Sequence, residues 1–474
     1  MKVTQVGIRP SQATIQAGRP VLTPELLAAC GARYSRNRGG LESILSRIDP
    51  ADLEKSVDSI FRMVDYGHQS IADLVPVAMF IDGVSIWLAY YLWTLSPTAG
   101  GQESSTRYLK VSLDGLIRAE KLGIPPARAP AWRQLMERCF QAYQAALVLW
   151  EELAGKDPAL MGIPASLLND PSEPARKKVA RMKRNYAFDR ARYFLPVAAA
   201  TNLMMVMSAR GWVGLCQHLL AHSLPEARSL GQGIRDELEM CAPRLVKHAQ
   251  CLEPVQRALA SEFDKLAALA RRQNPSPGGP TAAETQASAI PFLSVMPPPG
   301  VSPEDLARDL AWHANRYAPI GNSLQRMSVR FGWSAIAFAE IRDLNRHRTG
   351  TKYCPLTPRG FYFALDQLPA ASGGPADRRA LLLRQAKVGA EASARVNTLL
   401  CQGDPTCVYW SLLGTEYPFE HTTTADKFIY EAELRTGLGA HFRYARHLRD
   451  VLALWYEKFP CTKGLILEGS AEPE

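Results

Sequence analysis

One break in composition limits how this chain can distribute its residues among hydrophobic cores. From residue 274 to residue 300 the sequence is rich in proline, glycine, serine and alanine. Such a segment offers little apolar surface to offset the entropy lost on ordering. We therefore expect a flexible linker at residues 271–300, between a first unit of residues 1–270 and a second unit of residues 301–474. Each unit is long enough to bury a core of its own.

Both units mix helical and strand patterns, so we expect an α+β fold in which helices pack on a central mixed sheet. At the start of the second unit, Ser302 can cap a helix that has Pro303 at its first position and acids in its first turn. The expected helices are residues 49–64, 132–153 and 333–344, and the expected strands are residues 75–81 and 361–364.

Bulk composition narrows the class of protein. The net charge is +9, which suits an anionic ligand such as a nucleotide. The densest basic run, residues 176–184, fits a solvated helix face or an RNA-binding patch. Nine cysteines without a CxxC pair argue against a disulfide framework and a cysteine zinc site. No GxGxxG or GxxxxGK[ST] loop occurs, which argues against a Rossmann or P-loop nucleotide site.

The amino terminus lacks the apolar core of a signal peptide. The most apolar stretch, residues 75–95, is interrupted by Asp82 and Gly83, so it predicts buried structure rather than a membrane span. We therefore expect a cytoplasmic protein that does not contact a membrane.

Several cations stand in positions where they need partners. Arg346, His347 and Arg348 follow the expected helix 333–344, where they can surround an anion or complement the helix dipole. Arg210 is the only charge within residues 203–220, and Arg192 precedes an apolar turn. Because an unpaired buried charge is very costly, each needs an internal ion pair or a ligand phosphate.

Two histidines share one helix face, since His218 and His222 are four residues apart. That spacing suits zinc, but the segment lacks the glutamate of HExxH and an obvious third ligand. We expect no metal site.

Five short runs in the first unit resemble the flavin-dependent thymidylate synthase (ThyX) family in order and spacing. Together they extend the resemblance over most of residues 1–250. The runs are Tyr66-Gly67-His68-Gln69-Ser70, Ile81-Asp82-Gly83-Val84-Ser85, Gln102 to Tyr108, Ala191 to Pro196 and Ser208-Ala209-Arg210.

Each unit departs from this family pattern in a different place. The first has Leu95-Ser96-Pro97 where the family has RHR, Asp73 in place of a glutamate, and Leu219 in place of a late arginine. The second has Arg346-His347-Arg348 and supplies Arg435 at the spacing of that late arginine. Its Asp426 stands where the first unit has Arg210. The resemblance thus favours a diverged tandem fusion of two ThyX-like units, each keeping residues that the other has lost.

The resemblance implies a composite pocket for a flavin and a nucleotide. It implies FAD, NADPH and methylenetetrahydrofolate as cofactors and dUMP or a related pyrimidine nucleotide as substrate. Because family members are homotetramers, it also implies a homodimer of the fused chain, a pseudo-tetramer of units. In family terms, the flavin would contact His68, Ser70, Arg210, Arg346, His347 and Arg348, and the nucleotide would contact Glu103, Ser105, Arg107, Arg192 and Arg435, with Ser105 and Arg435 in the catalytic roles.

Four functions remain open from the sequence. The first is reductive C5 methylation of dUMP to dTMP. The second is flavin chemistry on another pyrimidine nucleotide. The third is a nucleotide- or RNA-binding pseudoenzyme without catalysis. The fourth is a structural partner of a conventional thymidylate synthase.

Overall fold

The computed structural model describes residues 1–35, 37–48, 52–65, 69–105, 111–273, 289–369, 375–437 and 440–469. Contacts divide the chain into two compact units. The first comprises Met1–Leu109, Gly115–Pro125 and Ala199–Asp264, and the second comprises Lys110–Asp114, Pro126–Ala198 and Lys265–Glu474. Residues 126–198, which the sequence groups with the first unit, thus pack with the carboxy-terminal part of the chain.

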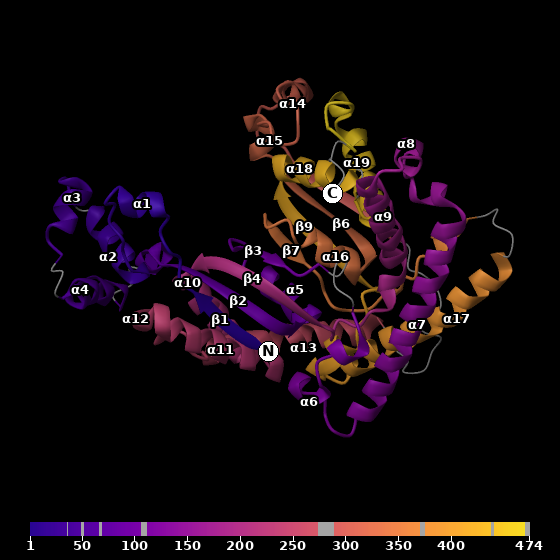
Figure 1. Cartoon of the computed structure of the whole chain (residues 1–474), viewed down its shortest axis with the longest axis horizontal. Helices are drawn as coiled ribbons and strands as arrows, with labels where there is room; N and C mark the ends of the chain where they lie inside the picture. Colours follow the sequence, from indigo (N-terminus) through magenta and orange to yellow (C-terminus); the bar gives the residue numbers. More distant parts are fainter. Residues whose placement is uncertain are drawn as a thin grey trace. The chain divides into compact units, whose positions relative to one another are not determined.

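The first compact unit is built on a four-stranded sheet of order β1-β2-β4-β3. The buried face carries alternate residues such as Val77, Met79 and Ile81, whereas Phe80 is exposed; this is the two-residue period of a half-buried strand. Helices α10 and α11 lie against this sheet (Figure 1). The strands are β1 (Lys2–Val6), β2 (Pro76–Ser85), β3 (Gly100–Glu103) and β4 (Ala200–Ser208).

A helical segment between β1 and β2 packs through α2 on the 3-10 helix η1. The helices of this unit are α1 (Gln12–Gln16), α2 (Pro24–Tyr34), α3 (Gly40–Leu45), α4 (Leu53–Asp65), η1 (Gln69–Leu74), α5 (Ile86–Leu95), α6 (Ala119–Leu122), α10 (Ala209–Ala221), α11 (Pro225–Cys241) and α12 (Pro243–Val246). The chain leaves this unit within α13 (Glu253–Gln273).

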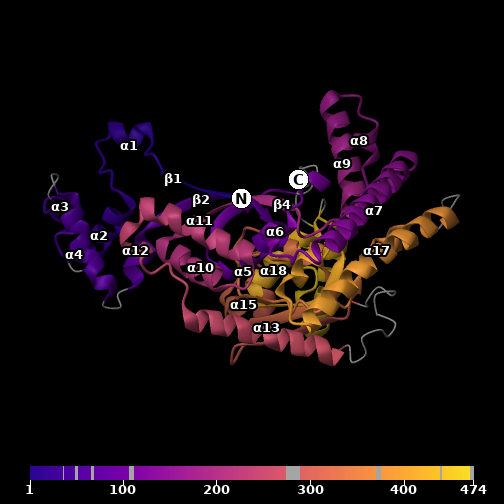
Figure 2. The same cartoon turned by 90° about the horizontal axis from the view of Figure 1, so that it is seen from below.

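The second compact unit is built on a sheet of order β5-β6-β9-β7, with β8 also paired to β9. Phe331, Trp333 and Phe419 fill the side of this sheet on which α18 and α19 pack. Long helices α7 and α9 run side by side (Figure 2). The strands are β5 (Pro291–Met296), β6 (Ser328–Ala337), β7 (Thr351–Tyr353), β8 (Gly360–Phe361) and β9 (Thr415–Thr424).

The main helices of the second unit are α7 (Ala129–Lys156), α8 (Ala165–Leu168), α9 (Glu173–Ala191), α14 (Pro303–Leu310), α15 (Asn322–Arg326), α16 (Phe338–Leu344), α17 (Pro375–Cys401), α18 (Ala425–Thr436) and α19 (Phe442–Lys458). Its 3-10 helices are η3 (Pro158–Met161), η4 (Arg192–Phe194), η6 (Leu365–Gln367), η7 (Pro405–Trp410) and η8 (Pro460–Thr462).

The two sheets repeat one strand order and one register. In the first, β2 and β4 pair Ile81 with Leu203 and Ser85 with Ala200. In the second, β6 and β9 pair Trp333 with Phe419 and Ala337 with Glu416. A register shift interrupts β2 between Asp82 and Val84 and β6 between Trp333 and Ile336, just before a helix begins in each case.

The α+β class is confirmed, and so are the strand at 75–81, the helix at 132–153 and the capped helix start. There Ser302 accepts from the N–H of Asp305, and the Asp305 carboxylate accepts from the N–H of Ser302. The structure gives α4 for the expected helix 49–64, although residues 49–51 lie outside the described residues. Only Gly360–Phe361 of the region around 361–364 forms a strand.

Three expectations need correction. The sheets are not mixed, because every strand pair in the described residues is antiparallel. The expected helix 333–344 begins only at Phe338, since Trp333 to Ala337 end strand β6. The register shift in that strand gives its buried residues a spacing that mimics a helix. Finally, Pro291–Met296 of the expected linker form β5, which pairs with β6.

Candidate functional site

The tripeptide Arg346-His347-Arg348 lies in a turn directly after α16. The N–H of Ala337 donates to the Glu340 carboxylate over 3.0 Å at the start of that helix, and the helix ends at Leu344. Because the chain leaves helical geometry here, the three side chains are not held at the 100° steps of a regular helix.

His347 is held between the turn and helix α18. Its Nε2 accepts a hydrogen bond of 2.8 Å from Nε of Arg435. Burial lowers the pKa of His347 to about 3, and the nearby charge of Arg435 acts in the same direction. The imidazole is therefore neutral at neutral pH, and its proton resides on Nδ1, since Nε2 is the acceptor.

A buried carboxylate lies close to the residues that hold this turn. Glu431, in α18, lies 3.1 Å from Nδ1 of His421. Burial alone would raise the pKa of Glu431, but His347, His421 and Lys352 around it lower that pKa to about 2. Nζ of Lys352 donates to the carbonyl of His347, and Nε2 of His421 donates to the carbonyl of Thr349 over 2.7 Å. The backbone of the tripeptide is thus fixed by a buried polar network.

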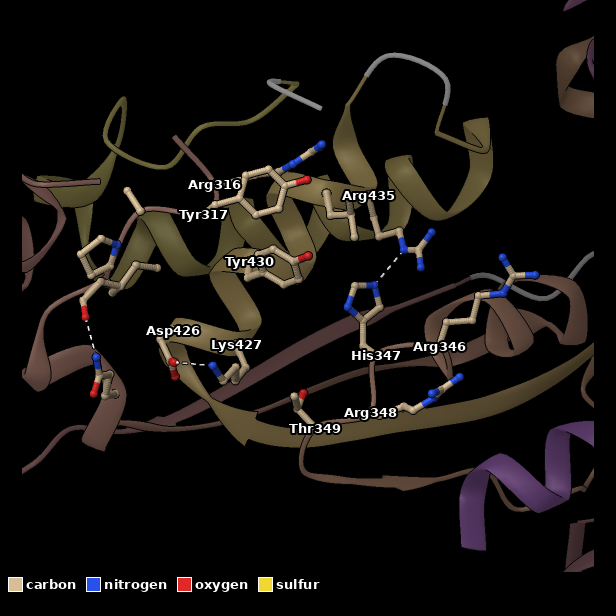
Figure 3. A pocket seen from close by; sticks show the side chains of 15 residues that line it. Arg316, Tyr317, Arg346, His347, Arg348, Thr349, Asp426, Lys427, Tyr430 and Arg435 are labelled. Carbon is tan, nitrogen blue, oxygen red and sulfur yellow. Dashed lines mark hydrogen bonds and ion pairs between the residues drawn. The ribbon is translucent and has the colours of Figure 1, made fainter. Parts of the chain in front are cut away.

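These residues line a pocket of about 640 Å³ in the second compact unit. Figure 3 shows His347 directed toward Arg435 on α18, while Arg346 and Arg348 extend away from Tyr430. Five of the lining side chains are Arg or Lys and one is Asp, so the pocket favours an anion. The lining residues are Arg316, Tyr317, Ala318, Pro319, Ile320, Gln325, Arg346, His347, Arg348, Thr349, Asp426, Lys427, Tyr430, Leu434 and Arg435.

Two guanidiniums in this pocket keep hydrogen-bonding capacity. Within the described residues, the terminal nitrogens of Arg435 and Arg346 have no hydrogen-bond partner. Arg346 approaches only Asp343, at 3.9 Å from its Nε. A pair of terminal guanidinium nitrogens matches the oxygens of a phosphate or a carboxylate.

Arg192 lies outside the pocket lining and forms an ion pair. Its Nη2 donates to Asp343 over 2.9 Å, and both side chains are buried. The pKa of Asp343 is lowered well below its usual range: burial opposes this, but Arg192, Arg346 and Arg342 outweigh it. Of the two alternatives that the sequence leaves open for Arg192, the structure contains the internal ion pair.

Arg210 also has an internal partner, although a solvated one. Its Nη1 donates to Asp73 over 2.8 Å, and both side chains are about half exposed, at 49% and 46%. Asp73 belongs to η1, which packs on α10 and also contains Ser70, an exposed residue. The first compact unit therefore holds Arg210 and Ser70 on neighbouring elements.

The remaining residues of the expected site are only partly described. Glu103 ends strand β3 and Ser105 follows it, and both are half-buried. His68 and Arg107 lie outside the described residues.

The late arginine and its counterpart occupy matching positions in the fold. Ala209 begins α10, and its N–H donates to the carbonyl of Val75 over 2.8 Å. Ala425 begins α18, and its N–H donates in the same way to the carbonyl of Met327 over 2.9 Å. Counted from these positions, Leu219 of α10 corresponds to Arg435 of α18. Leu219 and Arg435 thus occupy equivalent places on two equivalent helices, as their spacing in the sequence predicts.

Lys427, Tyr430 and Arg316 line the pocket without having been expected from the sequence. A signal existed for the first two, because Lys427, Tyr430 and Leu434 stand three and four residues apart along α18 and share a face. No local pattern marks Arg316, which comes from the irregular segment between α14 and α15.

The histidine pair of α10 has other contacts. His222 packs at 5.3 Å from the ring of Tyr91, and burial lowers its pKa to about 4. Nδ1 of His218 lies 3.1 Å from the carbonyl of Gly214. Among the described residues, no group of three or more His, Cys, Asp or Glu side chains is placed to hold a metal ion.

Residues 21–244 match the family model of the thymidylate synthase complementing protein, Thy1. This match covers slightly less than half of the chain. No helix in the described part of the chain is both long and apolar enough to cross a membrane.

Two curated relatives are distant. The chain is 26% identical over 254 residues to the UPF0159 protein Ta1429 of Thermoplasma acidophilum, an alignment that covers 49% of this chain and 51% of that protein. It is 24% identical over 229 residues to a flavin-dependent thymidylate synthase of Clostridium tetani, covering 48% of this chain and 82% of that protein. The chain thus spans about half the length of the first of these relatives.

One solved structure with a partial likeness is a UMP/dUMP methylase, PolB, from Streptomyces cacaoi, bound with 5-Br dUMP. Its sequence is 17% identical, and the match covers 52% of this chain and 93% of that chain with a TM-score of 0.31.

Proposed function

We propose that this protein is an FAD-dependent enzyme of the thymidylate synthase type, which methylates C5 of dUMP reductively with methylenetetrahydrofolate and NADPH. The observation that carries the proposal is the basic pocket that joins Arg346, His347 and Arg348 to Arg435. The family match at residues 21–244 and the distant likeness to a flavin-dependent thymidylate synthase support the same reaction class.

The two sheets support an origin by tandem fusion. They share strand order, register and the position of the register shift. Leu95 is separated from the first residue of β3 by the same number of residues as Arg346 is from the first residue of β7, and these two first residues are equivalent in the common register. One unit thus supplies the RHR tripeptide and the late arginine, and the other carries the GHxS and ExSxR runs. We propose that the two units contribute to a composite pocket in a homodimer of the fused chain.

The residues present suit an anionic dinucleotide such as FAD. Arg346 and Arg348 offer guanidiniums to phosphate oxygens, and the neutral His347 offers a ring N–H without adding charge. His68, Ser70 and Arg210 are further proposed flavin contacts, by family motif. When bound, the flavin supplies hydride-transfer chemistry, and the task of the protein is to bind, orient and exclude water.

For the nucleotide, we propose Glu103, Ser105, Arg107 and Arg435 as contacts, with Arg192 in a supporting role. Arg435 is the best supported, because His347 fixes its Nε while the terminal nitrogens remain available for a ligand. A guanidinium against a uracil carbonyl would stabilise negative charge on the ring as C5 becomes nucleophilic. Arg192 would act as a positioning residue, since Asp343 lies between it and Arg346.

The decisive experiment starts with the absorption spectrum of the purified full-length protein. We expect a flavin spectrum, bleaching by NADPH under anaerobic conditions, and production of dTMP once dUMP and methylenetetrahydrofolate are added. Protein that cannot be loaded with FAD would contradict both enzyme functions and leave a nucleotide- or RNA-binding pseudoenzyme. A flavoprotein that ignores dUMP but turns over another pyrimidine nucleotide would establish the second candidate. That candidate is favoured by the Asp73–Arg210 ion pair, which occupies a position where the family motif has glutamate.

The composite pocket is tested with single substitutions in the full chain. Arg107, a proposed nucleotide contact, and Arg346, a proposed flavin contact, lie in different compact units. Arg107→Ala should weaken binding of dUMP and Arg346→Ala binding of FAD, each by about tenfold or more, as loss of a charge-assisted hydrogen bond predicts. In one shared pocket each variant should also weaken binding of dUMP to the FAD-supplied protein. Arg326→Ala removes the same charge at an exposed position outside the pocket lining and should leave the affinity unchanged. If Arg346→Ala weakened FAD binding without any effect on dUMP binding, one shared pocket would be ruled out.

A further inference from the structure

The segment between α14 and α15 forms one wall of the pocket, and the family motifs do not include it. It contributes Arg316, Tyr317, Ala318, Pro319 and Ile320 to the lining. Its role in ligand binding depends on whether it is rigid and on what Arg316 contacts.

Hydrogen bonds hold this segment in one shape. His313 is buried, and its Nε2 lies 2.9 and 3.0 Å from the two carboxylate oxygens of Glu433 in α18, while its Nδ1 lies 3.1 Å from the carbonyl of Ala318. The carbonyl of Asn315 accepts from the N–H of Ala318 over 2.8 Å, and its side chain accepts from the N–H of Tyr317 over 2.9 Å. Arg316 and Tyr317 therefore occupy the two central positions of a stabilised turn.

The far end of the segment is fixed as well. Asp309 accepts hydrogen bonds from the N–H groups of Ser323 and Leu324 over 2.6 and 3.2 Å, which caps α15. With both ends anchored, the segment presents its side chains to the pocket with little conformational entropy left to lose on binding.

Arg316 has an unsatisfied nitrogen in this otherwise well-bonded turn. Its Nη1 is buried and has no hydrogen-bond partner among the described residues. Its guanidinium carbon lies 5.0 Å from the ring centroid of Tyr317, and no carboxylate of the described chain pairs with it. A buried guanidinium nitrogen without an acceptor is costly, and a ligand oxygen would remove that cost.

Two aromatic rings accompany this cation. Tyr317 is 74% exposed, although it lines the pocket. Tyr430, from α18, lines it too, and Figure 3 shows Tyr317 and Tyr430 as its aromatic members. Aromatic side chains around basic groups suit a ligand that carries a flat heteroaromatic ring as well as a phosphate.

We propose that Arg316 is a phosphate ligand of this pocket and that Tyr317 contacts the ring system of the same ligand. This inference rests on the proposed function and refines it, since it assigns a nucleotide-recognition role to a segment outside the family motifs. The shared chemistry is a phosphate ester attached to a planar heterocycle, which dUMP and FAD both provide.

Paired probes separate the phosphate from the ring and dUMP from FAD. Calorimetric titration of the full chain compares dUMP with deoxyuridine and FAD with riboflavin. Arg316→Ala should weaken the phosphorylated member of one pair by about tenfold or more, and change the affinity of its unphosphorylated partner by less than about twofold. The pair that responds identifies the source of the phosphate. Tyr317→Ala should weaken both members of that pair to a similar extent.

Stability provides a readout independent of flavin chemistry. Inorganic pyrophosphate should raise the melting temperature of the wild type and of Arg326→Ala, but not that of Arg316→Ala. Without ligand, the melting temperature of Arg316→Ala should not fall below that of the wild type, because no ion pair is lost. The inference would be overturned if Arg316→Ala lost the same affinity for phosphorylated and unphosphorylated probes. It would also be overturned if pyrophosphate stabilised Arg316→Ala as much as the wild type. Arg316-dependent pyrophosphate binding by a protein that never binds flavin would sustain the inference and defeat the proposed function.

Discussion

Nε of Arg435 donates a hydrogen bond of 2.8 Å to Nε2 of His347, which joins a late helix residue to the turn after α16. This contact orients the guanidinium so that its terminal nitrogens remain available for a ligand. It also keeps the imidazole neutral, because burial and the adjacent positive charge both lower the pKa of His347.

Replacing Arg435 should separate its charge from its geometry. Arg435→Ala removes both and should weaken nucleotide binding by about 2–3 kcal/mol, as expected for a hydrogen bond to a charged group. Arg435→Lys keeps the charge but loses the donor fork, so an intermediate loss is expected. Calorimetric titration with dUMP checks the order, and full affinity in Arg435→Lys would show that charge alone suffices.

The lowered pKa of His347 predicts a pH-dependent stability. In the unfolded chain a histidine gains its proton near pH 6.5, whereas in the folded protein His347 does so only at about pH 3. The unfolded state therefore binds more protons over that window, and stability falls as the pH drops below 6.5. Between pH 7 and 5 this residue should account for about 2 kcal/mol of the loss.

Urea denaturation at a series of pH values measures that contribution. The variant His347→Gln should show a shallower decline than the wild type between pH 7 and 5, because it lacks this titration. Parallel curves for the two proteins would mean that His347 is protonated in the folded state.

The two internal arginine pairs should differ in their value to stability. Arg192→Met leaves the buried Asp343 without its close partner and should cost about 3–5 kcal/mol of the free energy of unfolding. Arg210→Met breaks a half-exposed pair of similar length and should cost less than about 1 kcal/mol.

Chemical denaturation at neutral pH measures the free energy of unfolding of both variants. A double variant, Arg192→Met/Asp343→Leu, replaces both partners of the buried pair. That double variant should recover part of the loss, since it buries no unpaired charge. A small effect of Arg192→Met would instead favour a ligand role for this side chain.

Gly350, two residues after Arg348, should not tolerate a side chain. Its φ is +62°, and a Cβ atom there would lie 1.9 Å from the carbonyl oxygen of Thr422 on β9. Gly350→Ala should therefore displace the start of β7 and weaken ligand binding at the tripeptide. The matched control is Gly403→Ala, which has a φ of +75° but no atom within 4 Å of the added carbon.

The control should lose only about 1–2 kcal/mol from backbone strain, while Gly350→Ala should lose clearly more. Thermal unfolding of both variants tests this difference. Equal losses would mean that β7 can move away from Thr422 without cost.

Features that depend on neighbouring residues were predictable from the sequence. The short apolar run over 75–81 indicated a strand, and Ser302 with Asp305 indicated a helix start. The position of Arg346 to Arg348 after a helix was also predictable, as was the equivalence of Leu219 and Arg435. The sequence pattern was misleading at residues 333–337, because the register shift in β6 gives a strand the spacing of a helix.

The sequence by itself therefore determined the α+β class, a few helix and strand positions and the family resemblance, since these follow from local periodicity and motif order. The tertiary structure alone decided that Pro291–Met296 join a sheet, that residues 126–198 pack with the carboxy-terminal part, that Arg192 meets Asp343 and that Arg316 faces the same pocket as Arg435. The physical reason is that a charge finds its partner through long-range packing, which brings together residues that no local pattern connects.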